Sequence, residues 1–406
     1  MKGFVVYPTY RIEEDKALVY LFGRLENGES FLTINEFKPY FYIKKKDVVK
    51  VKKLKLDTNF AIEDSDFRNF KEELVSKVIL NLPKDVPRLR KAFEDEKIEC
   101  YEADIRFVYR FLIDKDIKGS LNIEGEHKKG KYVSRIYQNP ILKPVEFEPK
   151  LKTLSVDIET DSEAKEIYSI SLYSEDFKRV LIVSDKNLKN AESFRDEKSL
   201  LEKFKELIIK LDPDIITGWN VIDFDLAKIK ERFDANKIDF VLGRTEWKSS
   251  IRIQSDFFRD SSADIAGRMV LDAIHLLRSS FIRLEDCRLD TAANSFLNEK
   301  KLIDEENKGE EIERLFKNEP QKLVDYNLKD AELVFRILEK NKIIELTVER
   351  SLLTGMQLDR VKASIASLDS LYIRETRKKK YVCPSSSFEE REERINIKEE
   401  GEVILE

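Results

Sequence analysis

Residues 151–160 read LKTLSVDIET, an apolar run that is interrupted by two acidic residues. The run predicts a buried strand, and because side chains alternate along a strand, Asp157 and Glu159 should leave the same face. Two carboxylates on one face of a buried strand are costly unless a positive group lies between them, and a metal ion meets that need. The alternative is a strand end whose acids reach water.

The segments around this strand alternate between strand-like and helix-like patterns. EIYSISLYS at 166–174, RVLIVS at 179–184 and DIITGW at 214–219 are strand-like runs. SLLEKFKELIIKL at 199–211 has helical periodicity and ends before Pro213, and residues 320–347 form the clearest long helix of the chain. Strand runs followed by alternating helices and strands predict an α/β layer fold.

The rest of the chain predicts two further segments. Residues 1–145 alternate strand-like runs with turns and contain a helix candidate, DVPRLRKAFEDE at 85–96, that Asp85 could cap. Three prolines in QNPILKPVEFEPK, at 138–150, predict a linker. We therefore expect an N-terminal α+β domain at 1–145, an α/β domain at 146–348, and a helical segment with a charged tail at 349–406. The last residues, 388–406, are too polar to build a core alone.

The composition bounds the class of protein. The chain has 406 residues, of which 41% are hydrophobic and 38% charged, and a formal net charge of −5. It has no apolar run near the ~20 residues of a membrane helix, no signal-peptide layout, and three scattered cysteines. We expect a soluble, intracellular protein whose contacts with nucleic acid, if any, are local. Because only two histidines occur, a metal site would rest on carboxylates.

Two more acidic clusters follow the first. In GWNVIDFDL, at 218–226, Asp225 begins a predicted helix, where it could complete a metal site or be an ordinary first-turn aspartate. In YNLKDAEL, at 326–333, Tyr326 and Asp330 are four residues apart and share a helix face. The tyrosine could position an attacking water, or it could be a core-edge side chain beside a solvated aspartate.

Taken together, the three clusters resemble a known set of motifs. A strand DxE, a strand-loop NxxxFD and a helix YxxxD occur in this order in the DEDD exonucleases, and the tyrosine is typical of their DEDDy branch. The residues within these three motifs resemble those of the proofreading domain of family B DNA polymerases. KPYFYIKKKD and YEADIRFVYRFLIDKDI resemble the archaeal N-terminal domain, and LTGMQLDRVKASIASLDSLYIRETRKKKYVCP resembles bacterial polymerase II and its relatives. The resemblance covers about residues 1–385.

The resemblance implies a fold and a mechanism. The fold would be a ribonuclease H-like (DnaQ-like) exonuclease domain with a smaller N-terminal α+β domain. Two Mg²⁺ or Mn²⁺ ions would be held by Asp157, Glu159, Asp225 and Asp330. Tyr326 would orient the water, Thr160, Asn220 and Phe224 would contact DNA, and residues 244–266 would occupy the place of a strand-separating hairpin. The substrate would be a single-stranded or frayed 3′ end, in single-stranded or primer-template DNA.

A second site is implied in the N-terminal domain. Archaeal relatives sense template uracil in a pocket whose positions correspond here to Tyr10, Pro39, Tyr40, Val86, Ile105, Phe107 and Arg110. Apolar walls and one cation suit a flat base and a phosphate. The alternative is plain core packing, and Arg106 stands where the family has a proline.

The sequence also departs from the family. Its SLYPS and DTDS motifs, which carry the polymerising aspartates, do not occur, so the chain alone is not expected to synthesise DNA. It would be a truncated polymerase or one part of a split one, prokaryotic in type and cytoplasmic (nucleoid-associated). In a split polymerase it would bind a chain carrying palm, fingers and thumb, with the basic run at 377–380 near the attachment. A third hypothesis, an RNA-trimming nuclease, is disfavoured by the N-terminal match.

Overall fold

The computed structural model describes residues 1–254, 261–280, 282, 285–299 and 308–386. It divides into two compact units. Unit 1 comprises Met1–Pro8, Leu21–Thr33 and Lys118–Ser364, and unit 2 comprises Thr9–Tyr20, Ile34–Ile117 and Ile365–Glu406. This division differs from the three segments expected from the linker and the composition, which stay a prediction. The charged tail that was expected to lack a core lies outside the described residues.

Unit 1 contains a six-stranded mixed sheet. Its order is β15 (Ala191–Phe194), β14 (Lys178–Val183), β13 (Ile167–Tyr173), β12 (Thr153–Thr160), β16 (Ile215–Gly218) and β19 (Met269–Asp272). β12, β16 and β19 are parallel to one another, whereas β13 is antiparallel to β12 and to β14. The carboxyl ends of β12, β16 and β19 therefore meet at one edge, where sheets of this kind commonly bind ligands.

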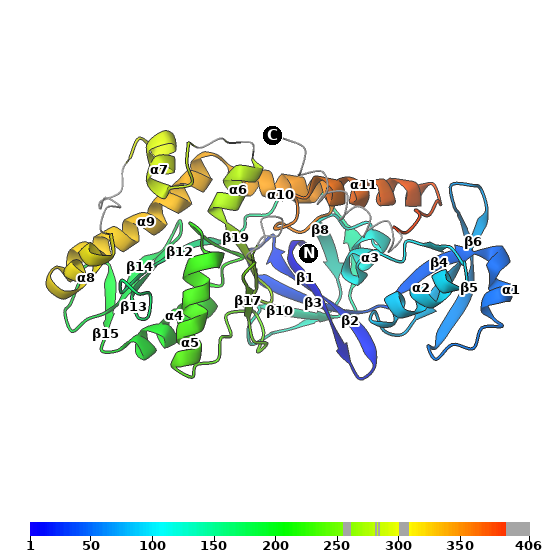
Figure 1. Ribbon diagram of the computed structural model, residues 1–406, viewed down its shortest axis with the longest axis horizontal. Helices are drawn as coiled ribbons and strands as arrows, with labels where there is room; N and C mark the ends of the chain where they lie inside the picture. Colours follow the sequence, from blue (N-terminus) through cyan, green and yellow to red (C-terminus); the bar gives the residue numbers. More distant parts are fainter. Residues whose placement is uncertain (255–260, 281, 283–284, 300–307, 387–406) are drawn as a thin grey trace, which may run out of the picture. The chain divides into compact units, whose positions relative to one another are not determined.

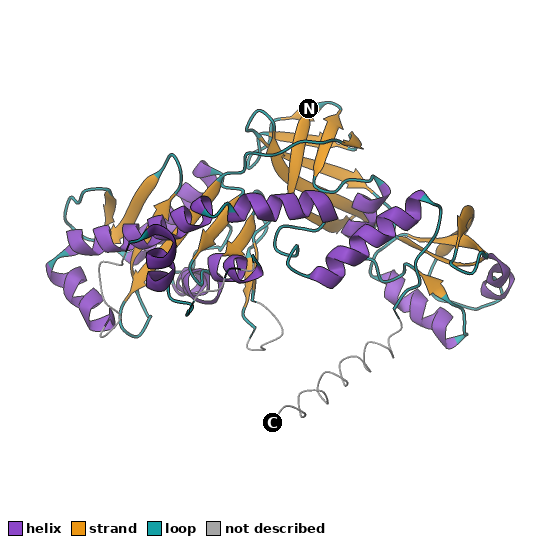
Figure 2. Ribbon diagram, turned by 90° about the horizontal axis from the view of Figure 1, so that it is seen from above, coloured by secondary structure: helices purple, strands orange, loops and turns teal. Residues whose placement is uncertain are grey.

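The two faces of this sheet are covered by different helices (Figures 1 and 2). Alternate residues of β12, namely Leu154, Val156 and Ile158, pack in one core with α4 (Glu197–Leu211) and α5 (Ala227–Ala235). The other face packs against α8 (Lys308–Asn318) and α9 (Pro320–Lys340). The predicted strands, the helix before Pro213 and the α/β layers are confirmed.

The predicted long helix at 320–347 is wrong at its end. α9 stops at Lys340, and a separate helix, α10 (Ile343–Thr354), follows. Asn341 donates from both its backbone and its side-chain nitrogen to the carbonyl of Ile337, and Lys342 adopts a left-handed φ of 51°. A left-handed residue cannot continue a right-handed helix, so the chain turns there.

Shorter elements also belong to unit 1. They are α6 (Ala273–Ser279), α7 (Leu289–Leu297) and a five-residue π-helical turn, η2 (Ile222–Leu226). β17 (Ser250–Arg252) and β18 (Ser262–Asp264) form an antiparallel pair within the predicted hairpin region. Residues 255–260 of that region lie outside the described residues.

A second, seven-stranded sheet has the order β11 (Ile141–Pro144), β8 (Ser120–Glu124), β1 (Lys2–Glu13), β2 (Lys16–Leu25), β3 (Ser30–Glu36), β10 (Arg135–Gln138) and β9 (His127–Lys128). Part of the proline-rich segment that was predicted as a linker is therefore the edge strand β11. Pro144 is tolerated there because an edge strand needs fewer backbone donors than a central one.

Unit 2 has a four-stranded sheet in the order β5 (Phe60–Arg68), β6 (Leu74–Leu80), β4 (Tyr40–Lys44) and β7 (Cys100–Tyr101). Its helical elements are η1 (Lys45–Asp47), α1 (Val48–Val51), α2 (Asp85–Asp95), α3 (Phe107–Asp114) and most of α11 (Ser364–Lys378). The N-cap of α2 is Lys84, so the predicted cap, Asp85, is the first helical residue instead. The expected α+β character of this region is confirmed.

None of the helices in the described part of the chain is long and apolar enough to cross a membrane.

Candidate metal centre

Three carboxylates from two elements lie together on the α9 face of the sheet. Asp157 is half-buried on β12, and Glu159 on the same strand is 3% exposed. Asp330 reaches them from α9 and is 1% exposed. One carboxylate oxygen of each lies within 4.8 Å of those of the other two. The predicted common face of Asp157 and Glu159 is confirmed, and the register of β12 with β13 shifts just after it, between Glu159 and Thr160.

Asp225 lies next to this group, on the π-helical turn after β16. Its Oδ1 accepts a hydrogen bond of 3.0 Å from the backbone N–H of Ile158, the residue between the two acids of β12. Burial raises the pKa of Asp225 well above its usual range, and the neighbouring charges of Glu159 and Asp272 raise it further. Such repulsion among buried carboxylates is what a bound cation would relieve.

Tyr326 lies one turn before Asp330 on α9, and it is 1% exposed. Burial raises its pKa above the usual range, and the charges of Asp330, Glu159 and Asp157 act in the same direction. The phenol therefore keeps its proton at neutral pH and can donate a hydrogen bond into the acidic group. The structure brings all five predicted catalytic residues to one place.

Two residues of this place were missed from the sequence. Asn327 donates from Nδ2 to Oδ2 of Asp157 at 2.6 Å. Asp272 ends β19 and caps α6, since its Oδ1 accepts from the N–H of Ile274 at 3.0 Å. Burial raises the pKa of Asp272. A signal existed for Asp272, because it stands between a strand-like MVL and a helical run. No such signal existed for Asn327, because its contact with Asp157 depends on the rotation of α9 about its own axis.

The three residues predicted to contact DNA are close in sequence to the predicted metal ligands. Thr160, half-buried, ends β12 and donates from Oγ1 to the carbonyl of Asp161. Asn220 is exposed and left-handed, with a φ of 60°, a conformation that asparagine tolerates better than most residues. Phe224 is 39% exposed on the π-helical turn. Their roles stay predictions.

The predicted uracil-pocket residues all belong to unit 2. The Tyr10 and Phe107 rings make an edge contact with centroids 5.2 Å apart, whereas Val86 packs in a different core with Phe41 and Phe93. Arg110 is buried in an ion pair of 2.6 Å with Glu102. Pro39 and Tyr40 are buried and Ile105 is half-buried. The uracil pocket stays a prediction.

The chemistry of the acidic group fits a divalent cation. The group offers only carboxylate oxygens, which are the ligands that hard divalent cations prefer. Two of its three members are buried, and an ionised carboxylate in such a place is stabilised by a positive group beside it. Asp157, Glu159 and Asp330 are therefore the residues that would hold a metal ion, with Asp225 beside them.

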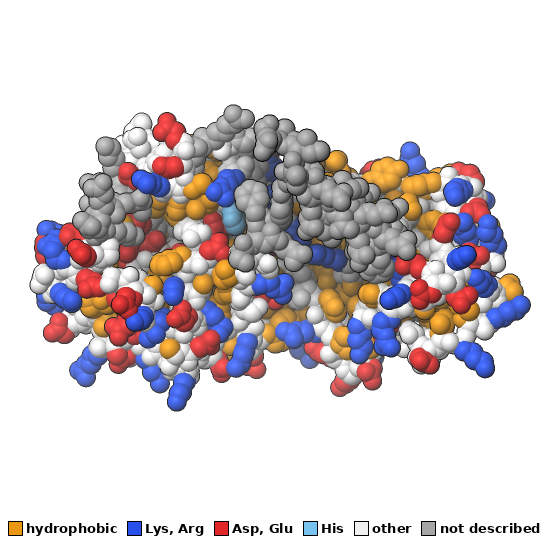
Figure 3. Space-filling view, viewed as in Figure 1, with side chains coloured by type: hydrophobic (Ala, Val, Ile, Leu, Met, Phe, Trp, Pro, Cys, Tyr) orange, Lys and Arg blue, Asp and Glu red, His pale blue; other side chains and the backbone are white. Residues whose placement is uncertain are grey.

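The charges on the visible surface are mixed. Acidic and basic side chains are interspersed over the described part of the face in Figure 3. The expectation from the net charge of −5, that any nucleic-acid contact is local, stays a prediction.

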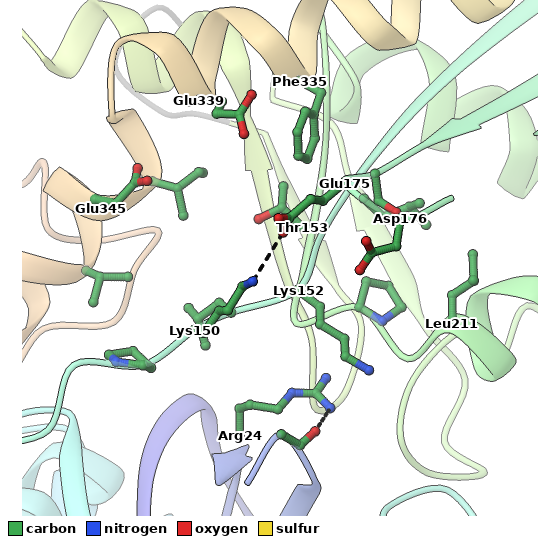
Figure 4. A pocket seen from close by; sticks show the side chains of 18 of the residues that line it. Arg24, Lys150, Lys152, Thr153, Glu175, Asp176, Leu211, Phe335, Glu339 and Glu345 are labelled. Atoms are coloured by element: carbon green, nitrogen blue, oxygen red, sulfur yellow. Dashed lines mark hydrogen bonds and ion pairs between the residues drawn. The ribbon is translucent and has the colours of Figure 1, made fainter. Parts of the chain in front are cut away.

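A cavity of about 840 Å³ lies elsewhere in unit 1. Lys152 and Thr153, at the amino end of β12, line it together with Phe335 of α9, and Lys150 and Glu175 form an ion pair of 3.4 Å there (Figure 4). None of the predicted catalytic residues lines it. The cavity and the acidic group are therefore separate features.

The mixed sheet, the helices on both of its faces and the carboxylate group on one face agree with the expected ribonuclease H-like fold. Comparison with known proteins agrees. Residues 98–291 match the family model described as DNA polymerase family B, exonuclease domain. This match includes Asp157, Glu159 and Asp225 and ends before α9. Residues 98–291 are thus similar to the exonuclease domain of family B DNA polymerases.

Individual relatives agree with the family match. DNA polymerase II of Escherichia coli (strain K12) is 28% identical over 94% of this chain and 49% of its own length. The DNA polymerase of Methanocaldococcus jannaschii is 30% identical over 81% of this chain and 20% of its own length. The solved family B DNA polymerase of the hyperthermophilic archaeon Pyrobaculum calidifontis shares the fold, with a TM-score of 0.75 and 21% identity over 95% of this chain and 52% of that one. The chain thus spans about half or less of these relatives.

Proposed function

We propose that this chain is a 3′→5′ DNA exonuclease, the proofreading module of a family B DNA polymerase. The observation that carries the proposal is the meeting of Asp157, Glu159 and Asp330 within 4.8 Å, in a chain whose residues 98–291 match that exonuclease domain. The substrate would be the 3′ end of single-stranded or frayed primer-template DNA, and the product a 5′-mononucleotide.

The proposed cofactor is a pair of divalent cations, Mg²⁺ or Mn²⁺. When bound, such a pair supplies Lewis-acid catalysis and a nucleophile at neutral pH. Asp157, Glu159, Asp225 and Asp330 would be the protein ligands. Burial of Asp225, and after it the charges of Glu159 and Asp272, disfavour its charged form in the free protein, so binding of a cation and loss of its proton should be linked.

The other residues of the site would hold the DNA and the water. Tyr326, which keeps its proton, can donate a hydrogen bond that orients the attacking water. Phe224 presents an exposed ring on which a terminal base can stack. Thr160 and Asn220 would hydrogen-bond the strand end. In-line attack requires these contacts to fix the last phosphodiester before the bond breaks.

The test is degradation of 5′-labelled single-stranded DNA with Mg²⁺ by the chain and by its Asp157→Ala variant. We expect a ladder of 3′-shortened products that the variant loses by at least about 100-fold, because a metal ligand is removed. Glu163→Ala is the matched control: this exposed acid lies in the loop after β12, and its loss should leave the ladder unchanged. A ladder that persists in Asp157→Ala would contradict the proposal, and equal degradation of RNA would contradict the DNA specificity.

A second role is docking to a separate chain that carries palm, fingers and thumb. The observation in its favour is an exposed apolar stripe on α11, where Ile365, Leu368 and Tyr372 are 77%, 65% and 58% exposed. Spacings of three and four residues place them on one helix face. The chain also spans only 49% of the E. coli polymerase. Co-purification with a palm-bearing chain, lost on Leu368→Glu, would support this role, and a monomer with full nuclease activity would count against it.

A further inference from the structure

We infer that Asn327 is a positioning residue that fixes the carboxylate of Asp157 for cation binding. This inference rests on the proposed nuclease. Asn327 follows Tyr326 on α9 and is completely buried. Its Nδ2 donates to Oδ2 of Asp157 at 2.6 Å, and its Oδ1 accepts from the hydroxyl of Ser169 at 2.9 Å. One side chain thus joins α9 to two neighbouring strands, β12 and β13.

The direction of the amide is set by its partners. An ionised carboxylate can only accept hydrogen bonds, so the nitrogen of Asn327 must face Asp157. Ser169 occupies the oxygen of the same amide. If the amide flipped, its oxygen would face the carboxylate and its nitrogen would face the serine. The carboxylate of Asp157 opposes that flip, whereas the hydroxyl of Ser169 can donate or accept. Asp157 therefore sets the direction of the amide, and Ser169 anchors its other end.

The bond limits how Asp157 can move. Asp157 is only half-buried, so packing alone does not hold its side chain, whereas Glu159 and Asp330 are enclosed. A hydrogen bond to one carboxylate oxygen fixes the plane of the group and leaves lone pairs for a cation. Partners of this kind behind a metal ligand typically change metal affinity by about 10–100-fold when they are removed.

Strand β13 offers a matched control for Ser169. Ser171 is also completely buried, lies two residues further along the same strand, and therefore shares its face. Its hydroxyl donates to the backbone carbonyl of Asp157 at 3.3 Å rather than to an amide side chain. Ser169→Ala and Ser171→Ala remove the same atom from the same strand, but only the first releases Asn327.

The experiment measures Mn²⁺ binding to the full chain by electron paramagnetic resonance, with thermal unfolding in the absence of cation recorded for each variant. Asn327→Ala should weaken binding by about 10-fold or more, and Ser169→Ala should weaken it less, in the same direction. Ser171→Ala should bind as the parent chain does. Adding Ser169→Ala to Asn327→Ala should cause no further loss, because the serine acts through the asparagine.

The outcomes separate the inference from the proposed function. If Asp157→Ala binds Mn²⁺ as tightly as the parent chain, the cation site itself fails. If Asp157→Ala binds weakly while Asn327→Ala and Ser169→Ala bind normally, the positioning role is overturned and the site stands. If Asn327→Ala does not fold, Ser169→Ala against Ser171→Ala still decides, since equal affinities for these two variants would overturn the inference.

Discussion

Asp225 is buried beside two other acidic side chains, and its ionisation couples the stability of the protein to pH. Burial comes first among the causes that raise its pKa, and the charges of Glu159 and Asp272 add to it. Backbone N–H groups, that of Ile158 among them, oppose the shift but do not cancel it. The free protein therefore carries a carboxylate that its surroundings disfavour.

This raised pKa predicts the behaviour of Asp225→Asn. Because the pKa in the folded state lies above that in the unfolded state, the stabilising contribution of the protonated acid is present at low pH and is lost as the pH rises. The amide cannot ionise, and its oxygen can still accept from Ile158. Without cation at pH 8, the variant should be more stable by roughly 1–3 kcal/mol, and the difference should vanish near pH 4. Thermal unfolding in EDTA from pH 4 to 9 measures it.

Asp223→Asn is the matched control, since Asp223 is exposed in the same π-helical turn. It should change the unfolding temperature little at any pH. A variant Asp225→Asn that is less stable than the parent chain at pH 8 would show that the acid is already compensated in the free protein.

The residues that the sequence could place are those governed by a local period. Asp157 and Glu159 follow from the alternation of a strand, and Tyr326 and Asp330 follow from the helical repeat. Asn327 could not be placed, because it lies one residue from Tyr326 and its partners lie on β12 and β13. Which strand faces a helical residue depends on the rotation of the whole helix, and no local pattern encodes that rotation.

Among the elements, the site combines regular and irregular backbone. β12 and α9 were predictable from periodicity, but the π-helical turn that carries Asp225 and the register shift after Glu159 were not. Both irregularities insert or displace a residue where the acids gather, as is common beside functional sites. The end of α9 was missed for a different reason: the apolar pattern continues into α10, while the break depends on the left-handed backbone of Lys342.

Three elements are joined by Glu197 in the first turn of α4. Its two oxygens accept from Nε and Nη2 of Arg232 on α5, both at 2.8 Å, and one also accepts from the N–H of Ile167 on β13. Although burial alone would raise it, the bonds from Arg232 and Ile167 hold the pKa of Glu197 below its usual range. The paired charge thus connects both helices on one face of the sheet to the strand that they cover.

We predict that Glu197→Gln destabilises the protein by about 1 kcal/mol at neutral pH, after allowance for solvent screening. A lowered pKa gives stability that is present above the unfolded value and is lost as the pH falls through the folded one. The deficit of the variant should therefore shrink below about pH 4. Urea unfolding at pH 7 and pH 3.5 measures it. Glu206→Gln, on the exposed side of the same helix, should have little effect, and equal losses for the two would contradict the prediction.

At the scale of unit 1, the sheet carries charged groups at both edges with opposite consequences. Under the proposed function the acids at the carboxyl ends of the strands would bind a cation, whereas the acids at the amino ends are paired with arginines of the protein itself. There Asp212 and Asp214 meet three buried arginines, Arg24 from β2, Arg244 and Arg268. Although burial would raise it, these guanidinium groups lower the pKa of Asp212 to about 2.

This cluster shows which contacts a boundary predicted from the linker leaves out of account. The proline-rich segment suggested a boundary near 145, yet Arg24, far earlier in the chain, donates from Nε to Asp214 at 2.8 Å and from Nη2 to the carbonyl of Asp212 at 2.6 Å. Asp214 in turn accepts from the N–H of Lys152, at the start of β12. Contacts between residues so far apart in sequence leave no mark in composition, so a boundary drawn from a linker alone misses them.

The cluster predicts an order of stability among three variants of the full chain. Asp214→Ala leaves three buried arginines around one aspartate, so it should cost about 3–5 kcal/mol or more. Arg24→Ala leaves two arginines with two aspartates, and it should cost less, roughly 3 kcal/mol. Arg135→Ala removes a partly exposed pair with Glu29 and should cost less than about 1 kcal/mol.

Urea unfolding followed by circular dichroism measures these costs. Mn²⁺ binding by the folded Arg24→Ala variant tests whether the arginine–aspartate cluster affects the acidic group at the other ends of the strands. We expect Mn²⁺ affinity to be unchanged, because Arg24 bonds to Asp212 and Asp214, just before β16, whereas Asp157, Glu159 and Asp225 lie toward the carboxyl ends of the strands. If Arg24→Ala were no more costly than Arg135→Ala, the buried cluster would contribute nothing that a surface pair does not. If it weakened Mn²⁺ binding as well, the two edges would be coupled through the strands, and the sheet would transmit strain from its structural edge to its acidic one.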